Sequence, residues 1–218
     1  SDAALVEGLA CIAPGEGVLS EEGSKKVPNT RAYWVVDPLD GTTNFAAGIP
    51  YWAISVARFV DGRPSEVFLD VPALNQRFVA LRGRGATRNN QPLTSETRAL
   101  ATSACVSLCS RSIRVLQRKP DQRFPGKIRL LGVASLNLVS VAMGQTIASL
   151  EATPKIWDLA AAWLVLDELG CPIRWLDADP AQLSPGEDVA DRGFPMLAAG
   201  SWAHLARFLP WGEALVRR

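Results

Sequence analysis

The segment that decides the fold is Trp34-Val-Val-Asp-Pro-Leu-Asp-Gly-Thr-Thr-Asn-Phe45, in which an apolar run leads into two acids and a Gly-Thr-Thr turn. Pro38 biases Asp37 toward an extended conformation, so we expect this acid at the end of a strand. Gly41 permits a left-handed backbone, and the amides after it would open a short helix whose N-terminus suits an anion. Two carboxylates would repel that anion unless a divalent cation lay between them, and magnesium takes both carboxylate and phosphate oxygens. The alternative is an Asx-turn in which Asp40 caps the helix.

Further acids stand at other element boundaries, namely Glu21, Glu22, Glu151 and Asp158. Taken singly, Asp158 is typical of a helix N-cap, and Glu151 is typical of a solvated surface acid. Taken as three sets, however, the acids each stand at an element boundary beside a glycine or a tryptophan. We therefore expect them to join the acids of the first segment in one cluster.

The pattern of apolar residues predicts a mainly β first half and a second half in which strands and helices alternate. In the first half we expect a helix at 2–12 and strands at 33–36, 53–60, 67–71 and 77–82. In the second half we expect strands at 101–108, 127–131, 146–150, 172–176 and 196–199, and helices at 111–118, 135–143, 158–169 and from residue 202. The chain is expected to form two tightly joined halves, 1–98 and 99–218, with a layered α/β (α+β) sheet architecture.

The composition narrows the class of protein. The 218 residues are 48% hydrophobic and 21% charged, which is enough to bury a substantial core. The net charge is only +1, from 23 basic and 22 acidic residues, so the sequence lacks the excess of positive charge that is typical of nucleic-acid-binding proteins. We expect no membrane span and no signal segment, and hence a soluble cytoplasmic protein. The four cysteines contain no Cys-x-x-Cys pair, and we expect them to be buried free thiols.

The segments "EEG…WVVDPLDGTTNF" and "EATPKIWDLAAAWLVLDELG", together with "GVASLNL" between them, closely resemble the signature regions of the inositol monophosphatase family. The resemblance covers nearly the whole chain, and the Thr-Thr-Asn-Phe ending of the first signature resembles the inositol monophosphatase branch. It implies a layered αβαβα sandwich of the sugar-phosphatase type and magnesium-dependent hydrolysis of a phosphate monoester. It also implies a homodimer and inhibition by lithium.

The resemblance implies two or three magnesium ions. Glu21, Asp37 and the backbone carbonyl of Leu39 would hold the first ion. Asp37, Asp40 and Asp158 would hold the second, and a third, weaker ion would rest on Glu21 and water. These ions would provide an activated water and neutralise charge on the phosphoryl oxygens.

The resemblance also implies the groups that bind phosphate and move protons. Gly41, Thr42 and Thr43 would bind the phosphate through amides and hydroxyls. Thr42, paired with Asp2, would take the proton of the attacking water, and Glu21 would contribute to the same step through the first ion.

The substrate beyond the phosphate would meet Ala134, the Val133 backbone, Glu151 and Asp158. Inositol monophosphate is the expected substrate, with histidinol phosphate or another sugar or nucleotide phosphate as alternatives. The sequence departs from the family pattern at Val133, where serine or threonine is usual, and at Cys171, where glycine is usual. The family's N-terminal helix and lysine-bearing loop have no counterpart in this sequence, which begins inside a helix, so we expect residues upstream.

Two hypotheses from other functional classes remain. Some members of the family act as regulatory binding partners, but Glu21, Asp37, Asp40, Thr42 and Asp158 are all present, which favours an enzyme. A calcium-binding structural module would need a loop with regular ligand alternation, and none is found.

Two further sets of residues are expected to lie outside the site. We expect His204 at the surface or in a partner contact. Arg111, Arg114 and Arg118 are expected to form a solvated stripe on one helix.

Overall fold

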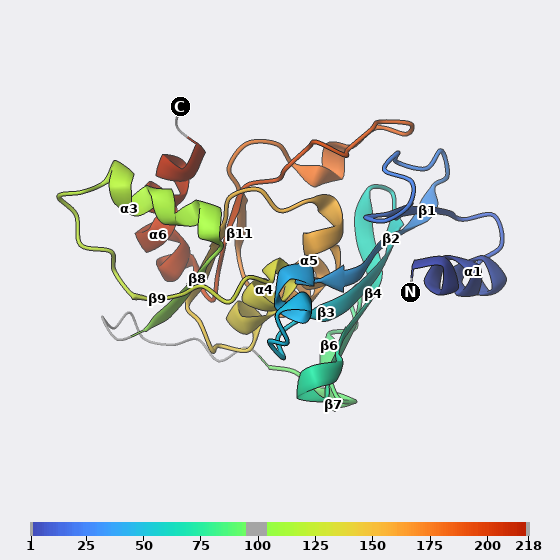
Figure 1. Cartoon of the computed structure of the whole chain (residues 1–218), viewed down its shortest axis with the longest axis horizontal. Coiled ribbons are helices and arrows are strands. Elements are labelled where there is room, and N and C mark those ends of the chain that lie inside the picture. Colours follow the sequence, from blue (N-terminus) through green and yellow to red (C-terminus); the bar gives the residue numbers. More distant parts are fainter. Residues whose placement is uncertain (1, 95–103, 217–218) are drawn as a thin grey trace.

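Two β-sheets alternate with three layers of helices, so the chain forms an αβαβα sandwich (Figure 1). The computed structural model describes residues 2–94 and 104–216. The first sheet has the strand order β1-β2-β3-β4-β5-β6-β7, and the second has the order β11-β12-β10-β8-β9. The layered architecture predicted from the sequence is confirmed.

The strands of the first sheet are β1 (Gly17–Ser20), β2 (Ala32–Asp40), β3 (Ala53–Val60), β4 (Arg63–Val71), β5 (Gln76–Leu81), β6 (Ala86–Arg88) and β7 (Gln91–Pro92). Those of the second sheet are β8 (Cys105–Leu108), β9 (Lys127–Arg129), β10 (Ala148–Glu151), β11 (Ile173–Trp175) and β12 (Met196–Ala199). The α-helices are α1 (Asp2–Ile12), α2 (Thr42–Ala46), α3 (Arg114–Arg118), α4 (Ala134–Ala142), α5 (Ile156–Glu168) and α6 (Trp202–Val216). Short 3-10 turns are η1 (Pro72–Leu74), η2 (Ser110–Ile113) and η3 (Pro180–Gln182).

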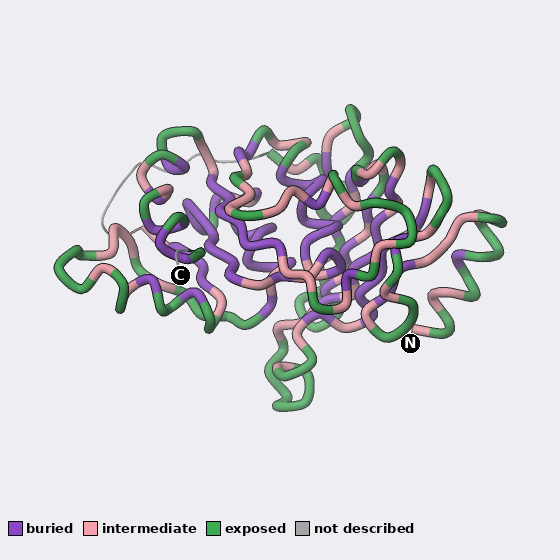
Figure 2. Tube along the Cα trace, turned by 90° about the horizontal axis from the view of Figure 1, so that it is seen from above, coloured by how far each residue is buried: buried purple, intermediate pink, exposed green. Residues whose placement is uncertain are grey.

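The buried residues follow the layers (Figure 2), and their apolar side chains form three clusters, the largest of which includes residues of both sheets and the helices between them. Alternate residues of β2 illustrate the division, because successive side chains of a strand point to opposite faces. Tyr33 and Val35 pack in the large central cluster, whereas Val36 packs with Leu9 of α1 on the other face. The third cluster lies between the second sheet and α6.

Helices α4 and α5 form the central layer between the two sheets (Figure 1). Nearly all residues of both helices are buried, as expected for helices that are covered on every side. The beginning of each helix is therefore fixed by packing on both sheets, and both helices begin at the functional site described below.

Several details differ from the sequence prediction. The strand predicted at 33–36 continues as β2 to Asp40, and the helix predicted at 111–118 is divided into η2 and α3. His204 is buried in α6 because its face of the helix packs on the second sheet, so its expected surface position is wrong. Cys11 is exposed and Cys171 buried, so the prediction of uniformly buried thiols is also wrong.

Residues 101–103 of the strand predicted at 101–108 and the predicted boundary between residues 98 and 99 lie outside the described residues. The division into two halves stays a prediction. No described helix is both long enough and apolar enough to cross a membrane.

Candidate active site

A bulge at the end of β2 turns two acids to the same side of the sheet. Asp37 pairs with Ser55 and Asp40 with Ala53, so the stretch that contains Pro38 has one residue more than the facing stretch of β3. In a regular strand, residues three apart would point to opposite faces. The additional residue restores the same face for Asp37 and Asp40, and a proline is tolerated in a strand at such a bulge.

Parallel pairing brings Glu21 next to these acids. Strand β1 runs parallel to β2 with Ser20 opposite Val36, so Glu21 and Asp37 follow the carboxyl ends of neighbouring strands. The Glu21 amide donates a hydrogen bond to the Val36 carbonyl at 3.1 Å, which fixes the backbone there. Lys25 donates to the Glu21 carbonyl, which closes the turn that follows.

Asp158 reaches the same place from the first turn of α5. One of its carboxylate oxygens accepts a hydrogen bond from the Lys155 amide at 2.8 Å. Lys155 is the N-cap and Asp158 is the third residue of the helix, so Asp158 closes a capping box and is not the N-cap that the simpler interpretation of the sequence proposed. Capping does not exclude a second role. Asp37, Asp40 and Asp158 each offer a carboxylate oxygen within 4.8 Å of the others.

The electrostatics of this trio fit a divalent cation. Burial raises the pKa of Asp37, and the charges of Asp40, Glu21 and Asp158 raise it further. Burial and the neighbouring acids likewise raise the pKa of Asp158 well above its usual value. Oxygen Oδ2 of Asp37 is buried, and within the described ranges no hydrogen-bond donor satisfies it. In the part of the chain that the structure describes, none of the three carboxylates forms an ion pair. Magnesium takes such hard oxygen ligands.

The turn after Asp40 depends on glycine. Gly41 has φ +95°, and a Cβ at this position would lie 2.7 Å from Cγ2 of Val133. Helix α2 starts directly after Gly41, as predicted, so its first backbone amides lie beside the trio of acids. The Thr42 hydroxyl donates to the Leu39 carbonyl at 3.0 Å. The two residues that the sequence assigns to different tasks, proton transfer and metal binding, are thus in direct contact.

Asp2 lies at the start of α1, where its carboxylate accepts a hydrogen bond from the Ser20 hydroxyl. Ser20 directly precedes Glu21, so Asp2 is connected to the edge of the site. Among the described residues, no hydrogen bond joins Asp2 to Thr42. Their pairing in proton transfer stays a prediction.

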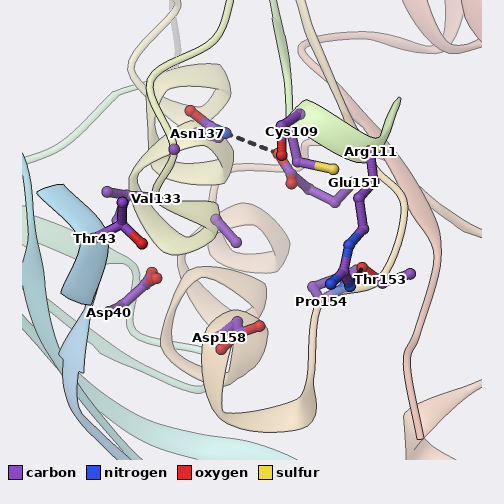
Figure 3. A pocket seen from close by; sticks show the side chains of 13 residues that line it. Asp40, Thr43, Cys109, Arg111, Val133, Asn137, Glu151, Thr153, Pro154 and Asp158 are labelled. Atoms are coloured by element: carbon purple, nitrogen blue, oxygen red, sulfur yellow. Dashed lines mark hydrogen bonds between the residues drawn. The ribbon is translucent and has the colours of Figure 1, made fainter. Parts of the chain in front are cut away.

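A cleft of about 410 Å³ opens next to the acids (Figure 3). Asp40 and Thr43 lie on one side of it, and Glu151 and Arg111 lie on the other side. Its lining also contains Cys109, Ser110, Gly132, Val133, Ala134, Asn137, Thr153, Pro154 and Asp158. The residues that were expected to bind substrate, Ala134 and Glu151, therefore share this cleft with two of the expected metal ligands.

Glu151 is held in a polar network and is not a solvated surface acid. Its Oε1 accepts hydrogen bonds from Asn137 Nδ2 at 3.0 Å and from the Ser149 hydroxyl at 2.9 Å. Burial raises the pKa of Glu151 to about 7, although these two donors lower it in part. Its carboxyl group can thus change charge near neutral pH.

The sequence prediction missed the contribution of the segment after β8. Strands β8 and β10 are parallel with Leu108 opposite Leu150, so Cys109 and Glu151 follow two adjacent carboxyl ends. Ligand sites of α/β proteins gather at such ends, and this signal could have identified the segment.

Arg111, Arg114 and Arg118 are all exposed, as the predicted solvated stripe requires, although they are divided between η2 and α3 and also make specific contacts. Arg114 and Arg118 donate to backbone carbonyls in the last turn of α6, where the helix has unpaired acceptors. Arg111 instead lines the cleft.

Comparison with known proteins identifies the family. The model of the inositol monophosphatase family matches residues 1–207. The chain belongs to this family. It is 33% identical over 196 residues to a Nus factor SuhB of Xylella fastidiosa, which covers 80% of this chain and 66% of that protein. It is 35% identical over 174 residues to a histidinol-phosphatase of Mycobacterium tuberculosis, covering 75% and 66%.

An inositol-1-monophosphatase of Mesorhizobium japonicum is 32% identical over 192 residues, covering 84% of this chain and 71% of that protein. Among solved structures, the extragenic suppressor protein suhB of Bartonella henselae superimposes with a TM-score of 0.80 at 27% identity, covering 99% and 86%. The chain spans 66% of the length of the Xylella and Mycobacterium relatives. The family resemblance and fold inferred from the sequence are thereby confirmed.

Proposed function

We propose that this chain hydrolyses a small phosphate monoester in a magnesium-dependent reaction. Inositol monophosphate is the first candidate substrate. The observation that carries the proposal is the trio of buried Asp37 and Asp40 with half-buried Asp158, which lies beside the start of α2. Family membership and relatives named as phosphatases support it.

The residues would divide the work as follows. Glu21, Asp37 and the Leu39 carbonyl would hold one magnesium ion, and Asp37, Asp40 and Asp158 would hold another. A third, weaker ion would rest on Glu21. Bound magnesium supplies an activated water and neutralises charge on the phosphoryl oxygens.

The remaining groups bind the substrate and move protons. The amides of Gly41, Thr42 and Thr43 would bind phosphate oxygens, because the first amides of a helix are free donors. The Thr42 hydroxyl would take the proton of the attacking water, with Asp2 as its partner. Glu151 and the backbone at Ala134 would bind hydroxyl groups of the alcohol. We further propose that the protein acts in the cytoplasm as a homodimer and is inhibited by millimolar lithium.

The test is phosphate release from a panel of substrates, namely inositol 1-phosphate, histidinol phosphate, fructose 1,6-bisphosphate and 3′-phosphoadenosine 5′-phosphate. Release should require magnesium, and Asp37→Asn should reduce kcat by at least about 100-fold, the scale of losing a charge-stabilising group. Asp121→Asn is the matched control, because Asp121 is exposed and lies outside the cleft. Equal rates for Asp37→Asn and wild type would contradict the proposal.

A binding role is the second candidate, favoured by relatives that are named Nus factor SuhB. The same panel separates the two roles. A folded protein that releases no phosphate from any substrate, yet keeps a magnesium-dependent rise in thermal stability, would favour the binding role.

A further inference from the structure

Among the described residues that line the cleft, Arg111 is the one with a basic side chain. It comes from η2, directly after the carboxyl end of β8. Its guanidinium lies beside Thr153 and Pro154, across the cleft from Asp40 and Thr43 (Figure 3). Arg111 is therefore separated from the place where the scissile phosphate is proposed to bind.

The guanidinium is held in position by a neutral partner. Nη1 of Arg111 donates to the Thr153 hydroxyl at 2.8 Å. Within residues 2–94 and 104–216, the arginines that form ion pairs are Arg31, Arg58, Arg77 and Arg192, and Arg111 is not one of them. A guanidinium has five N–H donors in a rigid fork, so most of them are left for a ligand.

A purely structural role for Arg111 fits these contacts less well. Its neighbours Arg114 and Arg118 bind carbonyls of α6 and so stabilise helix packing, but the Arg111 side chain does not take part in those contacts. Glu151 is close in the sequence to Thr153, yet its carboxylate is bound by Asn137 and Ser149 instead. The arginine is thus positioned without being neutralised.

We propose that Arg111 forms a second anion subsite, which selects substrates that carry a carboxylate or a second phosphate in addition to the scissile phosphate. The inference rests on the proposed phosphatase function and narrows its substrate class to doubly anionic phosphate esters, which would take the place of inositol monophosphate as first candidate. Arginine binds both anions through paired, charge-assisted hydrogen bonds, so one residue can serve either chemistry. Thr153 is a positioning residue that keeps the fork turned into the cleft.

The test compares substrates that differ in one anionic group. One pair is fructose 1,6-bisphosphate and fructose 1-phosphate, and the other is 3-phosphoglycerate and glycerol 3-phosphate. In wild type, kcat/KM should be higher for the doubly anionic member of at least one pair, and the pair that responds identifies the second group as phosphate or carboxylate. Arg111→Ala should reduce kcat/KM for that member by about 10- to 100-fold, mostly through KM, and change its partner by less than about two-fold.

Matched variants distinguish a specific effect of Arg111 on substrate preference from a general effect of removing one positive charge. Arg123→Ala removes the same charge from an exposed position outside the cleft and should leave the preference unchanged. Arg111→Lys should keep part of the preference, because the charge remains but the fork is lost. Thr153→Val should give an intermediate loss. Equal losses for both members of each pair in Arg111→Ala would overturn the subsite, as would a wild type with no preference in either pair.

Binding measurements distinguish failure of this inference from failure of the proposed function. Calorimetric titration of the calcium-loaded protein with both fructose phosphates reports affinity without turnover. If the bisphosphate binds more tightly and Arg111→Ala removes the difference, the subsite holds even when no phosphate is released. The same titration with 3-phosphoglycerate and glycerol 3-phosphate tests a carboxylate. If the two members bind alike in both pairs, the subsite is excluded whether or not the enzyme turns over.

Discussion

The carboxylate of Asp40 accepts a hydrogen bond from the backbone amide of Ser135, which lies 95 residues further along the chain, at a distance of 2.9 Å. Asp40 ends β2 in the first sheet, and Ser135 lies in the first turn of α4 in the central layer. One acid thus caps a buried helix and belongs to the candidate metal cluster. The candidate site and the packing of α4 against the first sheet depend on the same contact.

This contact predicts different results for two substitutions of Asp40. Asp40→Asn keeps an oxygen that can accept from the Ser135 amide but removes a metal-binding charge. We expect a folded protein whose magnesium affinity, measured by calorimetry, falls by at least about 100-fold, the upper range seen for disturbed metal sites. Asp40→Ala also removes the acceptor and leaves a buried amide unpaired, so it should be about 1–3 kcal/mol less stable than Asp40→Asn in urea unfolding. Equal stability of the two variants would show that the hydrogen bond does not hold α4.

The acidic cluster predicts that the metal-free protein becomes less stable as the pH rises. Burial raises the pKa of Asp37, Asp40 and Glu151 above their unfolded values, so the native state binds more protons than the unfolded state. The free energy of unfolding must then fall with increasing pH above about 4, where the unfolded acids begin to ionise. Urea unfolding in EDTA between pH 5 and 8 measures this slope.

Magnesium should reverse this trend, because a ligand that binds only the native state stabilises it. A hundredfold excess over the dissociation constant contributes about 2.7 kcal/mol. The gain should be larger at pH 8 than at pH 5, since protons compete for the same oxygens. Stability that rises with pH in EDTA would contradict the assignment of the cluster.

The parts of the fold that could be predicted are those fixed by local pattern. Strands β3 and β12 have the predicted bounds, because each is a mainly apolar run closed by turn residues. The acids could also be grouped, because each set stands at an element boundary beside a glycine or a tryptophan. In the structure, the parallel pairing of β1 and β2 accounts for the position of Glu21 next to Asp37.

The parts that could not be predicted depend on contacts distant in the sequence. The bulge that aligns Asp37 with Asp40 is set by the register with β3, and a strand pattern alone contains no information on it. The sequence does not distinguish Arg111 from Arg114 and Arg118. In the structure, Arg114 and Arg118 bind carbonyls at the end of α6, whereas Arg111 lines the cleft. His204 was misplaced because a lone polar residue does not reveal which face of α6 packs on the sheet.

Glu151→Gln keeps the shape of this side chain but removes its charge, so it tests how the buried charge affects stability. Below its native pKa of about 7 the wild-type carboxyl is largely protonated, so at pH 5 the two metal-free proteins should be similarly stable. Above pH 7 the wild type carries a buried charge that the variant lacks, so the variant should be more stable at pH 8. Urea unfolding at the two pH values measures the difference.

The same variant tests the role of Glu151 in substrate binding. A neutral amide is a weaker partner for substrate hydroxyls, so kcat/KM should fall about 10-fold, the scale of one charge-assisted hydrogen bond, while magnesium affinity stays within about two-fold. A large loss of magnesium affinity would instead assign Glu151 to the metal site.

Gly41→Ala should disturb the turn that places α2 beside the acids. A side chain at φ +95° is strained, and its Cβ would lie 2.7 Å from Cγ2 of Val133. We expect a loss of about 1–3 kcal/mol in urea unfolding and a matching loss of phosphatase activity. The double variant Gly41→Ala/Val133→Ala removes the close contact but not the backbone strain, so its destabilisation should be smaller than the sum of the two single variants. Strict additivity would show that the backbone angle, and not the contact with Val133, requires glycine at this position.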